Sequence, residues 1–423
     1  MRHRPLATAV LVPLLGALAL AGCAKNNTGG GGTTAASCTK GADIKDAAAS
    51  GGGGGATGTT SASSGPSVAP SGKTYTIGAI QPQSGPNAQL GINESNAVQL
   101  AIEEANKSGK YPFQLKYAIS DDEGDQAKAP AAAQKLIDQK DIVAVIGPAF
   151  SGVTKNAQPK FKVAHLAAVS PSATNPDLSK NGWDTFFRVV PPDNAQGEKA
   201  SDFLAKYAKK VYLVDDKSEY GVGLAKVIET SLKGKGVEVT HEGIEAGSAD
   251  YSGIATKVKS SGAGALYYSG YYSDLAKFAK ALKSAGFDCL SMSGDGSNDD
   301  QLVALGGDAV NGWLLTCPCT DAKLVPAAAS FVKAYQAKWN TPPSTYSPES
   351  YDATNAVIQA IASVQGPVTR ESVLAAIKAV DYQGLTVTVK FQSNGEVEGG
   401  KVNVFGVADG KRGLKGSVDD LLK

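Results

Sequence analysis

Short apolar runs alternate with amphipathic stretches through most of this chain, and this alternation constrains the fold more than any other feature. The runs are nearly continuous in apolar residues, which is typical of strands in parallel sheets that helices cover on both faces. The intervening stretches repeat apolar residues every three to four positions, as helices do. The pattern therefore predicts an α/β fold with doubly wound parallel sheets.

The predicted elements follow one another from residue 75 to residue 317. The predicted strands cover residues 75–80, 114–120, 142–149, 165–171, 209–216, 237–244, 265–272, 289–294 and 312–317. The predicted helices cover residues 95–106, 127–139, 220–234 and 273–286, with one more after residue 151.

The amino terminus has the features of a secretion signal, with arginines ahead of an apolar stretch over residues 6–20. This stretch is short for a bilayer span, which takes about 20 residues. It ends in the sequence LAGC, residues 20–23, which resembles the lipobox of bacterial lipoproteins. Residues 1–22 are therefore predicted to be a signal peptide. Cys23 is predicted to carry the lipid that anchors an extracytoplasmic protein to the cell membrane, although ordinary secretion is the alternative.

Residues 24–72 are rich in Gly, Ser, Thr and Ala and contain no aromatic residue. Such a segment cannot bury enough apolar surface to offset its ordering entropy, so residues 23–73 are predicted to be a lipid-anchored, disordered linker. The remainder, from Thr74 to Lys423, is too long for one ordinary core and long enough for two domains. The formal net charge of +1 makes nucleic acid an unfavourable partner, and membrane contact is expected from the lipid alone.

Four cysteines remain after the one assigned to the lipid: Cys38, Cys289, Cys317 and Cys319. An extracytoplasmic location permits disulfides, and the sequence leaves the pairing open. The Cys-Pro-Cys pattern at 317–319 has no CxxC partner and no nearby histidine, so a metal site is not predicted. No cofactor is predicted either.

Small polar and aromatic residues follow the predicted strands at their carboxyl ends in both halves of the chain. In open parallel sheets, ligands bind outside these ends. The residues concerned include Ser151, Ser172, Thr174, Tyr271 and Asp295. This arrangement predicts a ligand cleft between two α/β lobes.

The chain from about Thr74 to its carboxyl end resembles the extracytoplasmic solute-binding proteins of branched-chain amino acid ABC transporters. The resemblance rests on the order and spacing of short motifs: Ser84-Gly85-Pro86, Asp121-Asp122, Val145-Ile146-Gly147, Ser170-Pro171-Ser172-Ala173-Thr174, Phe187-Arg188, Gln196-Gly197, Tyr220-Gly221, Gly270-Tyr271 and Gly294-Asp295-Gly296. It implies a type I periplasmic-binding fold, in which two doubly wound lobes are joined by a three-crossing hinge. It also implies a protein, expected to be a monomer, that captures a small amino acid of branched-chain or other apolar type and delivers it to permease subunits.

The resemblance assigns the amino acid's α-carboxylate and part of its ammonium to the first lobe, at Ser151 and the turn Ser172, Ala173, Thr174. Ser151 would act at a helix N-terminus, where the dipole favours an anion. Thr174 would offer its N–H to the carboxylate and its hydroxyl to the ammonium, and Ser172 its carbonyl to the ammonium. The alternative is that Ser172 and Thr174 only cap the following turn.

The resemblance assigns the cover of the ligand to Tyr220 and Tyr271, for which packing between lobes is the alternative. Asp295 falls where the family carries an acidic partner for the ammonium, often glutamate, and a simple turn is its alternative. Leu90 stands where the leucine-specific branch has an aromatic residue, so the pocket is expected to be wider or less discriminating.

The same resemblance implies lobe boundaries. The first lobe would hold residues 74–190 plus 321–394, and the second 191–320 plus 395–423. The three crossings would lie near Val190–Pro192, Pro318–Thr320 and Asn394–Glu398.

Two other classes of function compete with this one. An enzyme is disfavoured, because Ser151 lacks a Gly-x-Ser-x-Gly context and the Gly-Lys-Thr at 72–74 lacks the spacing of a phosphate loop. The paired carboxylates Asp121-Asp122 and Asp215-Asp216 would point to opposite faces of a strand, and no catalytic residue is predicted. A sensory or regulatory binding module would use the same fold, and the sequence does not separate it from transport.

Overall fold

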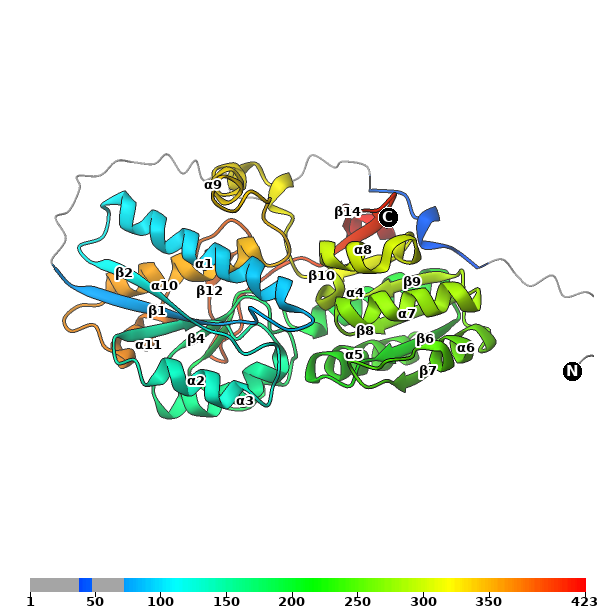
Figure 1. Cartoon of the computed structure of the whole chain (residues 1–423), viewed down its shortest axis with the longest axis horizontal. Coiled ribbons are helices and arrows are strands. Elements are labelled where there is room, and N and C mark those ends of the chain that lie inside the picture. The colour runs from blue at the N-terminus through cyan, green and yellow to red at the C-terminus, as the bar shows by residue number, and fades with distance from the viewer. Residues whose placement is uncertain (1–37, 48–71) are drawn as a thin grey trace, which may run out of the picture. The chain divides into compact units, whose positions relative to one another are not determined.

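The computed structural model describes residues 38–47 and 72–423. The predicted signal peptide and Cys23 lie outside the described residues. Two α/β lobes make up the part that is described, and each is built around its own sheet (Figure 1). The structure thus has the alternating α/β architecture that the sequence predicts.

The first lobe contains a five-stranded sheet with the order β2-β1-β3-β4-β5, in which all neighbours are parallel. Its strands are β1 (Thr74–Ile80), β2 (Gln114–Ser120), β3 (Ile142–Ile146), β4 (Ala168–Ser170) and β5 (Phe186–Arg188). Every residue of β3 is buried, as expected for a strand covered on both faces.

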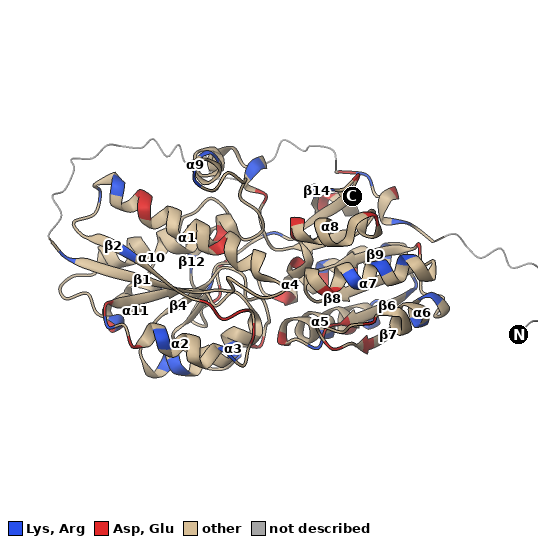
Figure 2. Ribbon diagram, viewed as in Figure 1, with Lys and Arg blue, Asp and Glu red and all other residues tan. Residues whose placement is uncertain are grey.

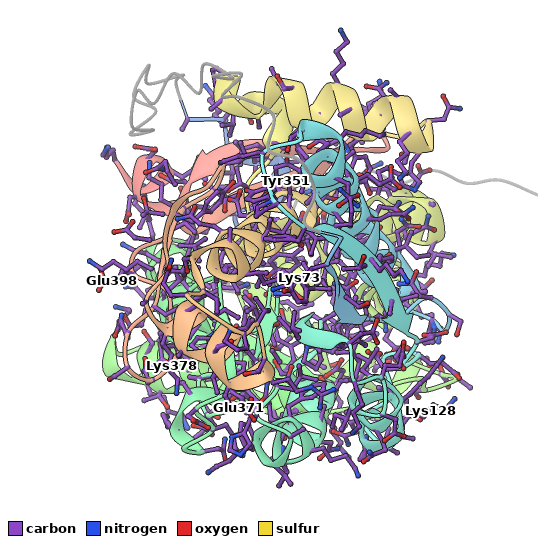
Figure 3. The ribbon with its side chains drawn as sticks, turned by 90° about the vertical axis from the view of Figure 1, so that its left-hand side faces the viewer. Lys73, Lys128, Tyr351, Glu371, Lys378 and Glu398 are labelled. Atoms are coloured by element: carbon purple, nitrogen blue, oxygen red, sulfur yellow. A yellow bond between two sulfur atoms is a disulfide. The ribbon has the colours of Figure 1, made fainter. Side chains whose placement is uncertain are left out.

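Helices cover this sheet from two parts of the chain: α1 (Ala88–Ser108), α2 (Ala129–Ile137), α3 (Ser151–Val163), α10 (Ser347–Ser363) and α11 (Arg370–Lys378). Val98 of α1, Val357 of α10 and Ile377 of α11 share one apolar core with the sheet. α9 (Ala329–Trp339) lies further out and packs Phe331 on Tyr351 of α10, with ring centroids 4.8 Å apart (Figure 3).

The second lobe contains a seven-stranded sheet with the order β14-β13-β10-β9-β8-β6-β7. Five strands are mutually parallel: β6 (Lys210–Asp215), β7 (Glu238–Gly243), β8 (Ala265–Ser269), β9 (Leu290–Ser293) and β10 (Leu314–Cys317). Two antiparallel strands from the carboxyl end extend it: β13 (Asn403–Ala408) and β14 (Lys411–Ser417). Its helices are α4 (Asp193–Tyr207), α5 (Glu219–Gly234), α6 (Ser252–Ser260), α7 (Tyr272–Ala285), α8 (Asp300–Gly306) and α12 (Val418–Leu422).

The chain leaves the first sheet after β5, leaves the second sheet after β10, and returns to the second sheet before β13. Arg188 at the end of β5 is fully buried and pairs with Glu396, from the segment that precedes β13, through both guanidinium Nε and Nη2. This pair therefore joins two of the three chain segments that run between the lobes.

Several predicted boundaries differ from the structure. The strand predicted over 165–171 is only Ala168–Ser170, and the strand predicted over 265–272 ends at Ser269 because α7 begins at Tyr272. The predictions also missed β5, β13 and β14, together with the short hairpin of β11 (Asp381–Gln383) and β12 (Thr388–Lys390). β14 has the sequence KRGLKGS, which is charged and glycine-rich and lacks the apolar run by which the other strands were predicted. Charged residues of this kind are common in strands at the edge of a sheet.

Residues 38–47 pack on the second lobe, although composition placed them in the linker. Thr39 accepts a hydrogen bond from the N–H of Leu290 at 2.7 Å, and the N–H of Ala47 donates to the carbonyl of Lys415 at 2.8 Å. Ile44 is buried in the core of that lobe. A disulfide between Cys38 and Cys289 closes the contact, and we call residues 38–47 the amino-terminal strap.

The second disulfide joins Cys317 and Cys319, at the end of β10. It lies where the chain leaves the second sheet for the first lobe. The structure thus shows which of the four cysteines pair, a question that the sequence left open.

Candidate functional site

A small enclosed cavity lies where residues of both lobes meet, next to the carboxyl ends of β3, β4, β8 and β9. Its volume is about 10 Å³, which is room for about one water. The residues that line it are Leu90, Glu94, Ala149, Phe150, Ser151, Ser172, Tyr220, Tyr271, Asp295, Gly296 and Tyr346. Six of the eight predicted ligand residues are in this lining. Pockets that hold small ligands have volumes of about 300 Å³ or more, so a ligand requires the two lobes to separate or the lining to rearrange.

Ser151 is the first residue of α3, directly after the N-cap residue Phe150. The first N–H groups of a helix have no partner within the helix and carry its positive dipole end. The Ser151 hydroxyl oxygen accepts from the N–H of Asn175 at 3.2 Å, which leaves its hydrogen free to donate. This corner of the cavity can therefore bind an anion such as a carboxylate.

The turn after β4 is held from behind by a buried arginine. Nη1 of Arg188 donates to the carbonyls of Ala173 and Asn175, each at 2.9 Å. The Ser172 hydroxyl donates to the carbonyl of Ala149 at 2.8 Å, which ties the turn to the neighbouring strand end. The conformation of this turn is thus fixed by the scaffold before any ligand arrives.

Two predicted site residues, Ala173 and Thr174, do not line the cavity. The Ala173 side chain packs in a small core with Leu178 and Phe186, and its carbonyl is occupied by Arg188. Thr174 is completely buried one residue further on, and its hydroxyl has no hydrogen-bond partner among the described residues. Thr174 is therefore behind the cavity wall in this structure.

Asp295 begins the short 3-10 helix after β9 and contributes the cavity's acidic group from the second lobe. The hydroxyl of Tyr220 donates to Oδ1 at 2.8 Å, and the hydroxyl of Tyr346 donates to Oδ2 at 2.7 Å. Burial raises the pKa of Asp295, and these two bonds oppose the shift. Gly294 permits the approach of Tyr220, because a Cβ at that position would lie 2.3 Å from the tyrosine oxygen.

Aromatic rings form the wall between the anion corner and Asp295. Tyr271 packs on Phe150 of the first lobe with ring centroids 4.5 Å apart, and on Tyr220 with centroids 5.2 Å apart. Leu90 of α1 adds aliphatic surface. These groups can cover an apolar side chain while the polar groups beside them hold charged ends.

Two lining residues with polar side chains, Glu94 and Tyr346, were missed by the sequence analysis. Glu94 is four residues after Leu90, so both share one face of α1, and this spacing is a signal that could have found it. Burial raises the pKa of Glu94 to about 8, and the side chain of Gln81 donates to it at 3.1 Å. Tyr346 follows no strand, so the rule that located the other residues does not reach it.

No Lys, Arg or His is in the lining of this cavity within residues 38–47 and 72–423. Over the rest of the described chain, both signs of charge are interspersed on the helices (Figure 2). The cavity thus combines a helix N-terminus with buried acids, a set of groups suited to a ligand that carries one negative and one positive end.

A larger open groove, about 530 Å³, borders α9 and is lined by residues such as Leu324, Val332 and Lys333. It contains none of the predicted site residues and no acidic side chain. Size alone would favour it, but the convergent polar groups are in the cleft, so the cleft is the candidate ligand site. In the described part of the chain, no helix combines the length and apolarity needed to cross a membrane.

Comparison with known proteins agrees with this fold. The family model described as "Periplasmic binding protein" matches residues 74–411. The chain is 29% identical over 336 residues to a leucine-, isoleucine-, valine-, threonine- and alanine-binding protein of Pseudomonas aeruginosa, covering 78% of this chain and 89% of the relative. It is 31% identical over 307 residues to a Leu/Ile/Val-binding protein of Rhizobium johnstonii, covering 72% of this chain and 83% of the relative.

Two solved structures show the same similarity. A leucine-binding protein of Thermotoga maritima superposes with a TM-score of 0.76 at 26% identity, covering 81% of this chain and 98% of that one. A branched-chain amino acid transporter substrate-binding protein of Streptococcus pneumoniae, solved with isoleucine, superposes with a TM-score of 0.74 at 28% identity, covering 82% and 99%. The type I periplasmic-binding fold and the relationship predicted from sequence are confirmed, and the chain belongs to the periplasmic binding protein family.

Proposed function

We propose that this protein captures a small amino acid with an apolar side chain in the interlobe cleft and delivers it to an ABC importer. One observation carries the proposal: a single cavity is bordered by the N-terminus of α3 at Ser151 and by the buried carboxyl of Asp295. The first suits an α-carboxylate, the second an α-ammonium, and Leu90 with the aromatic wall suits an apolar side chain. The names of the relatives, which include leucine, isoleucine and valine, support this class of ligand.

The decisive experiment is a calorimetric screen of the purified, ligand-stripped protein against the standard amino acids. Saturable binding of one or more apolar amino acids is expected. A protein that binds none of the twenty would contradict the proposal.

We place the lobe boundaries at residues 74–190 plus 321–394 and 191–320 plus 395–423, with Arg188–Glu396 between two of the crossings. A ligand that contacts both lobes stabilises the closed arrangement by its differential affinity for it. Closure over the ligand is the property that a permease would recognise.

The remaining proposals concern location and class. A lipid on Cys23 would hold the protein at the outer face of the cell membrane, and a Cys23→Ser variant should then move from the membrane fraction to the soluble fraction. Transport predicts that a deletion strain loses uptake of the ligand, whereas a sensory module predicts intact uptake and a lost response. Ligand binding without chemical change is expected, since the cavity residues fit a binding protein and no enzymatic step is proposed.

A further inference from the structure

The open groove beside α9 has the size of a small-molecule site, although it lies outside the interlobe cleft. Its volume is about 530 Å³, and pockets that hold small ligands have volumes of about 300–1,000 Å³. Its lining comes from α9 and from two short 3-10 helices that precede α9, Ala322–Leu324 and Pro326–Ala328. The groove shares no lining residue with the cleft, so a ligand bound here would occupy a second site.

α9 is held on the first lobe by one of its faces. Phe331 and Tyr335 are buried, and they share an apolar cluster with Leu100 of α1 (Figure 1). The residues of α9 that line the groove recur every three to four positions and form a second stripe along the helix: Ala329, Val332, Lys333, Gln336 and Ala337. The helix thus presents a further partly apolar surface beside the one that fixes it in place.

The segment before α9 contributes exposed apolar surface to the same groove. Leu324 is 61% exposed, and Val325 and Pro326 follow it in the lining. Apolar side chains that gather on an exposed surface are typical of a site that binds a partner or a ligand. An aliphatic group in the groove would remove this surface from water, which is favourable in proportion to the area covered.

The charged residues of the groove are all positive. They are Lys323 and Lys333, and the lining contains no Asp or Glu. Nζ of Lys323 lies 3.7 Å from a carboxylate oxygen of Asp321, and the other lysine of α9, Lys338, pairs with Glu103. Lys333 is exposed and forms no ion pair within residues 38–47 and 72–423. A ligand with one negative charge would therefore find its complement at Lys333.

The groove suits a small molecule better than a membrane surface. Anionic lipid surfaces attract clusters of about four to eight basic residues, whereas this lining has two lysines. A phosphate monoester carries a charge of about −1.5 to −2 near neutral pH, whereas a carboxylate carries a single charge, which one lysine can match. These features together favour a free molecule with an aliphatic body and one carboxylate.

We propose that the groove beside α9 is a second ligand site, which binds a free aliphatic carboxylate with its tail on Leu324, Val325 and Val332 and its charged end at Lys333. The inference goes beyond the proposed function and does not rest on it, because no residue of the cleft takes part. The tail supplies most of the affinity, since an ion pair at an exposed lysine contributes little. The length of the tail is therefore the most sensitive probe of the site.

The test is titration calorimetry of the whole protein with decanoate near pH 7.5, with and without saturating L-leucine. We expect one site with a dissociation constant of about 0.1–1 mM, as for a ligand of about twelve non-hydrogen atoms in an open groove. Octanoate should bind about 3- to 15-fold more weakly, because each methylene removed from water contributes up to about fourfold. Leucine should leave the affinity for decanoate unchanged.

Two variants on the surface of the groove test the assigned contacts. Lys333→Glu replaces an attraction by a repulsion, so decanoate should bind about 3- to 10-fold more weakly. Leu324→Gln keeps the size of an exposed side chain but removes apolar surface, so affinity should fall by about threefold or more. The matched controls are Lys135→Glu, at an exposed lysine of α2, and Leu305→Gln, at an exposed leucine of α8. Both controls should bind decanoate as wild type does.

The outcomes separate this inference from the proposed function. The inference is overturned if decanoate shows no saturable binding, or if wild type, Lys333→Glu and Leu324→Gln bind it equally. Displacement of decanoate by leucine would place decanoate in the cleft and overturn the inference too. A Cys23→Ser protein that binds phosphatidylglycerol vesicles but not free decanoate would assign the groove to a membrane surface instead. A protein that binds decanoate but no amino acid would contradict the proposed function and support the second site.

Discussion

The hydroxyl of Tyr346 in the first lobe donates to Oδ2 of Asp295 in the second lobe, with an oxygen–oxygen distance of 2.7 Å. Together with the bond from Tyr220 to Oδ1, it occupies both oxygens of the acid that is proposed to hold the ligand's ammonium. A carboxylate has about four lone-pair sites, so it can keep both tyrosines and still accept from an ammonium. Tyr346 thus stabilises the closed lobes and prepares Asp295 for its ligand.

The first prediction concerns this closing bond. Tyr346→Phe removes one hydrogen bond to a charged acceptor, which typically contributes about 1.5–3 kcal/mol. The ligand-free variant should therefore open more often, and small-angle scattering should give a larger radius of gyration than for wild type. Saturating ligand should close both proteins to the same size.

Tyr351→Phe is the matched control, since Tyr351 bonds to Glu104 within the first lobe (Figure 3). Equal sizes of the ligand-free Tyr346→Phe and wild-type proteins would mean that the bond does not hold the lobes closed.

The second prediction concerns the anion corner. Ser151→Ala keeps the helix N–H groups and removes one hydroxyl donor to a carboxylate, so affinity should fall by about 10- to 150-fold. Calorimetry with the best ligand measures the change. Ser252→Ala also changes a serine at the first position of a helix, far from the cleft, and should have no effect. Unaltered affinity of Ser151→Ala would leave Ser151 as an acceptor for Asn175 and no more.

The third prediction concerns Asp295 and the ammonium. Asp295→Asn retains an acceptor for a tyrosine but removes the charge, and the loss of one member of a buried pair costs about 3–5 kcal/mol. Binding of leucine should weaken by about a hundredfold or more. The deaminated analogue 4-methylpentanoate should bind wild type poorly and the variant less poorly, because the analogue has no cation to pair with Asp295. If Asp295→Asn changes the binding free energies of leucine and of 4-methylpentanoate by the same amount, Asp295 does not belong to the ammonium site.

The sequence predicted those parts of the site that follow from local rules. Ser151 and Asp295 were found because residues after parallel strands converge at one edge of a sheet, and six of eight candidates do line the cavity. Tyr220 and Tyr271 also follow predicted strands, whereas Leu90 came from the family resemblance alone, and all three line the cavity.

The residues that the sequence missed depend on long-range packing. Tyr346 reaches the cavity from the loop before α10, which enters the first lobe only after the chain has completed most of the second. Glu94 is an acid whose burial is visible only once the surrounding helices are in place. β13 was missed for a related reason, since its pairing with β10 joins segments some ninety residues apart. β14 pairs with β13, and its own sequence, KRGLKGS, is charged and glycine-rich.

The fourth prediction concerns pH and stability. Burial raises the pKa values of Glu94 and Glu349 to about 8 each, whereas in the unfolded chain both titrate near their ordinary value. Between about pH 4.5 and pH 8 the folded protein therefore binds more protons than the unfolded one, and its free energy of unfolding falls as pH rises. Each unit of pKa difference is worth about 1.4 kcal/mol. Thermal unfolding should show a lower Tm at pH 8 than at pH 6.

Variants separate these two acids from the rest. Glu94→Gln and Glu349→Gln should each reduce the slope of Tm against pH, because the neutral amide has no proton to lose. Glu398→Gln changes an exposed carboxyl and should leave the slope unaltered (Figure 3). A Tm that is constant or rises from pH 6 to pH 8 in wild type would contradict the assignment of buried, protonated acids.

The last prediction concerns the amino-terminal strap, residues 38–47. The strap is bound by the Cys38–Cys289 disulfide and by backbone hydrogen bonds to Leu290 and Lys415. Cys289 immediately precedes β9, and Asp295 follows that strand, so the strap attaches at the end of the second sheet opposite the cleft. Chain that precedes residue 38 is therefore attached to the second lobe. It is not attached to the first lobe, although β1, the first strand along the chain, belongs to that lobe.

A cleavage experiment tests this attachment of the strap to the second lobe. A protease site is inserted between residues 48 and 71 of a protein captured on beads through an amino-terminal tag, which makes the result independent of the lipid. After cleavage without reductant, the binding lobes should stay on the beads, because the disulfide still joins Cys38 to Cys289. Reductant, or Cys38→Ser with Cys289→Ser, should release them once the non-covalent contacts dissociate. A control site between residues 24 and 37 should release the protein under either condition. Immediate release of the non-reduced protein by the first cut would show that Cys38 and Cys289 are not joined and that the strap does not hold the amino terminus to the second lobe.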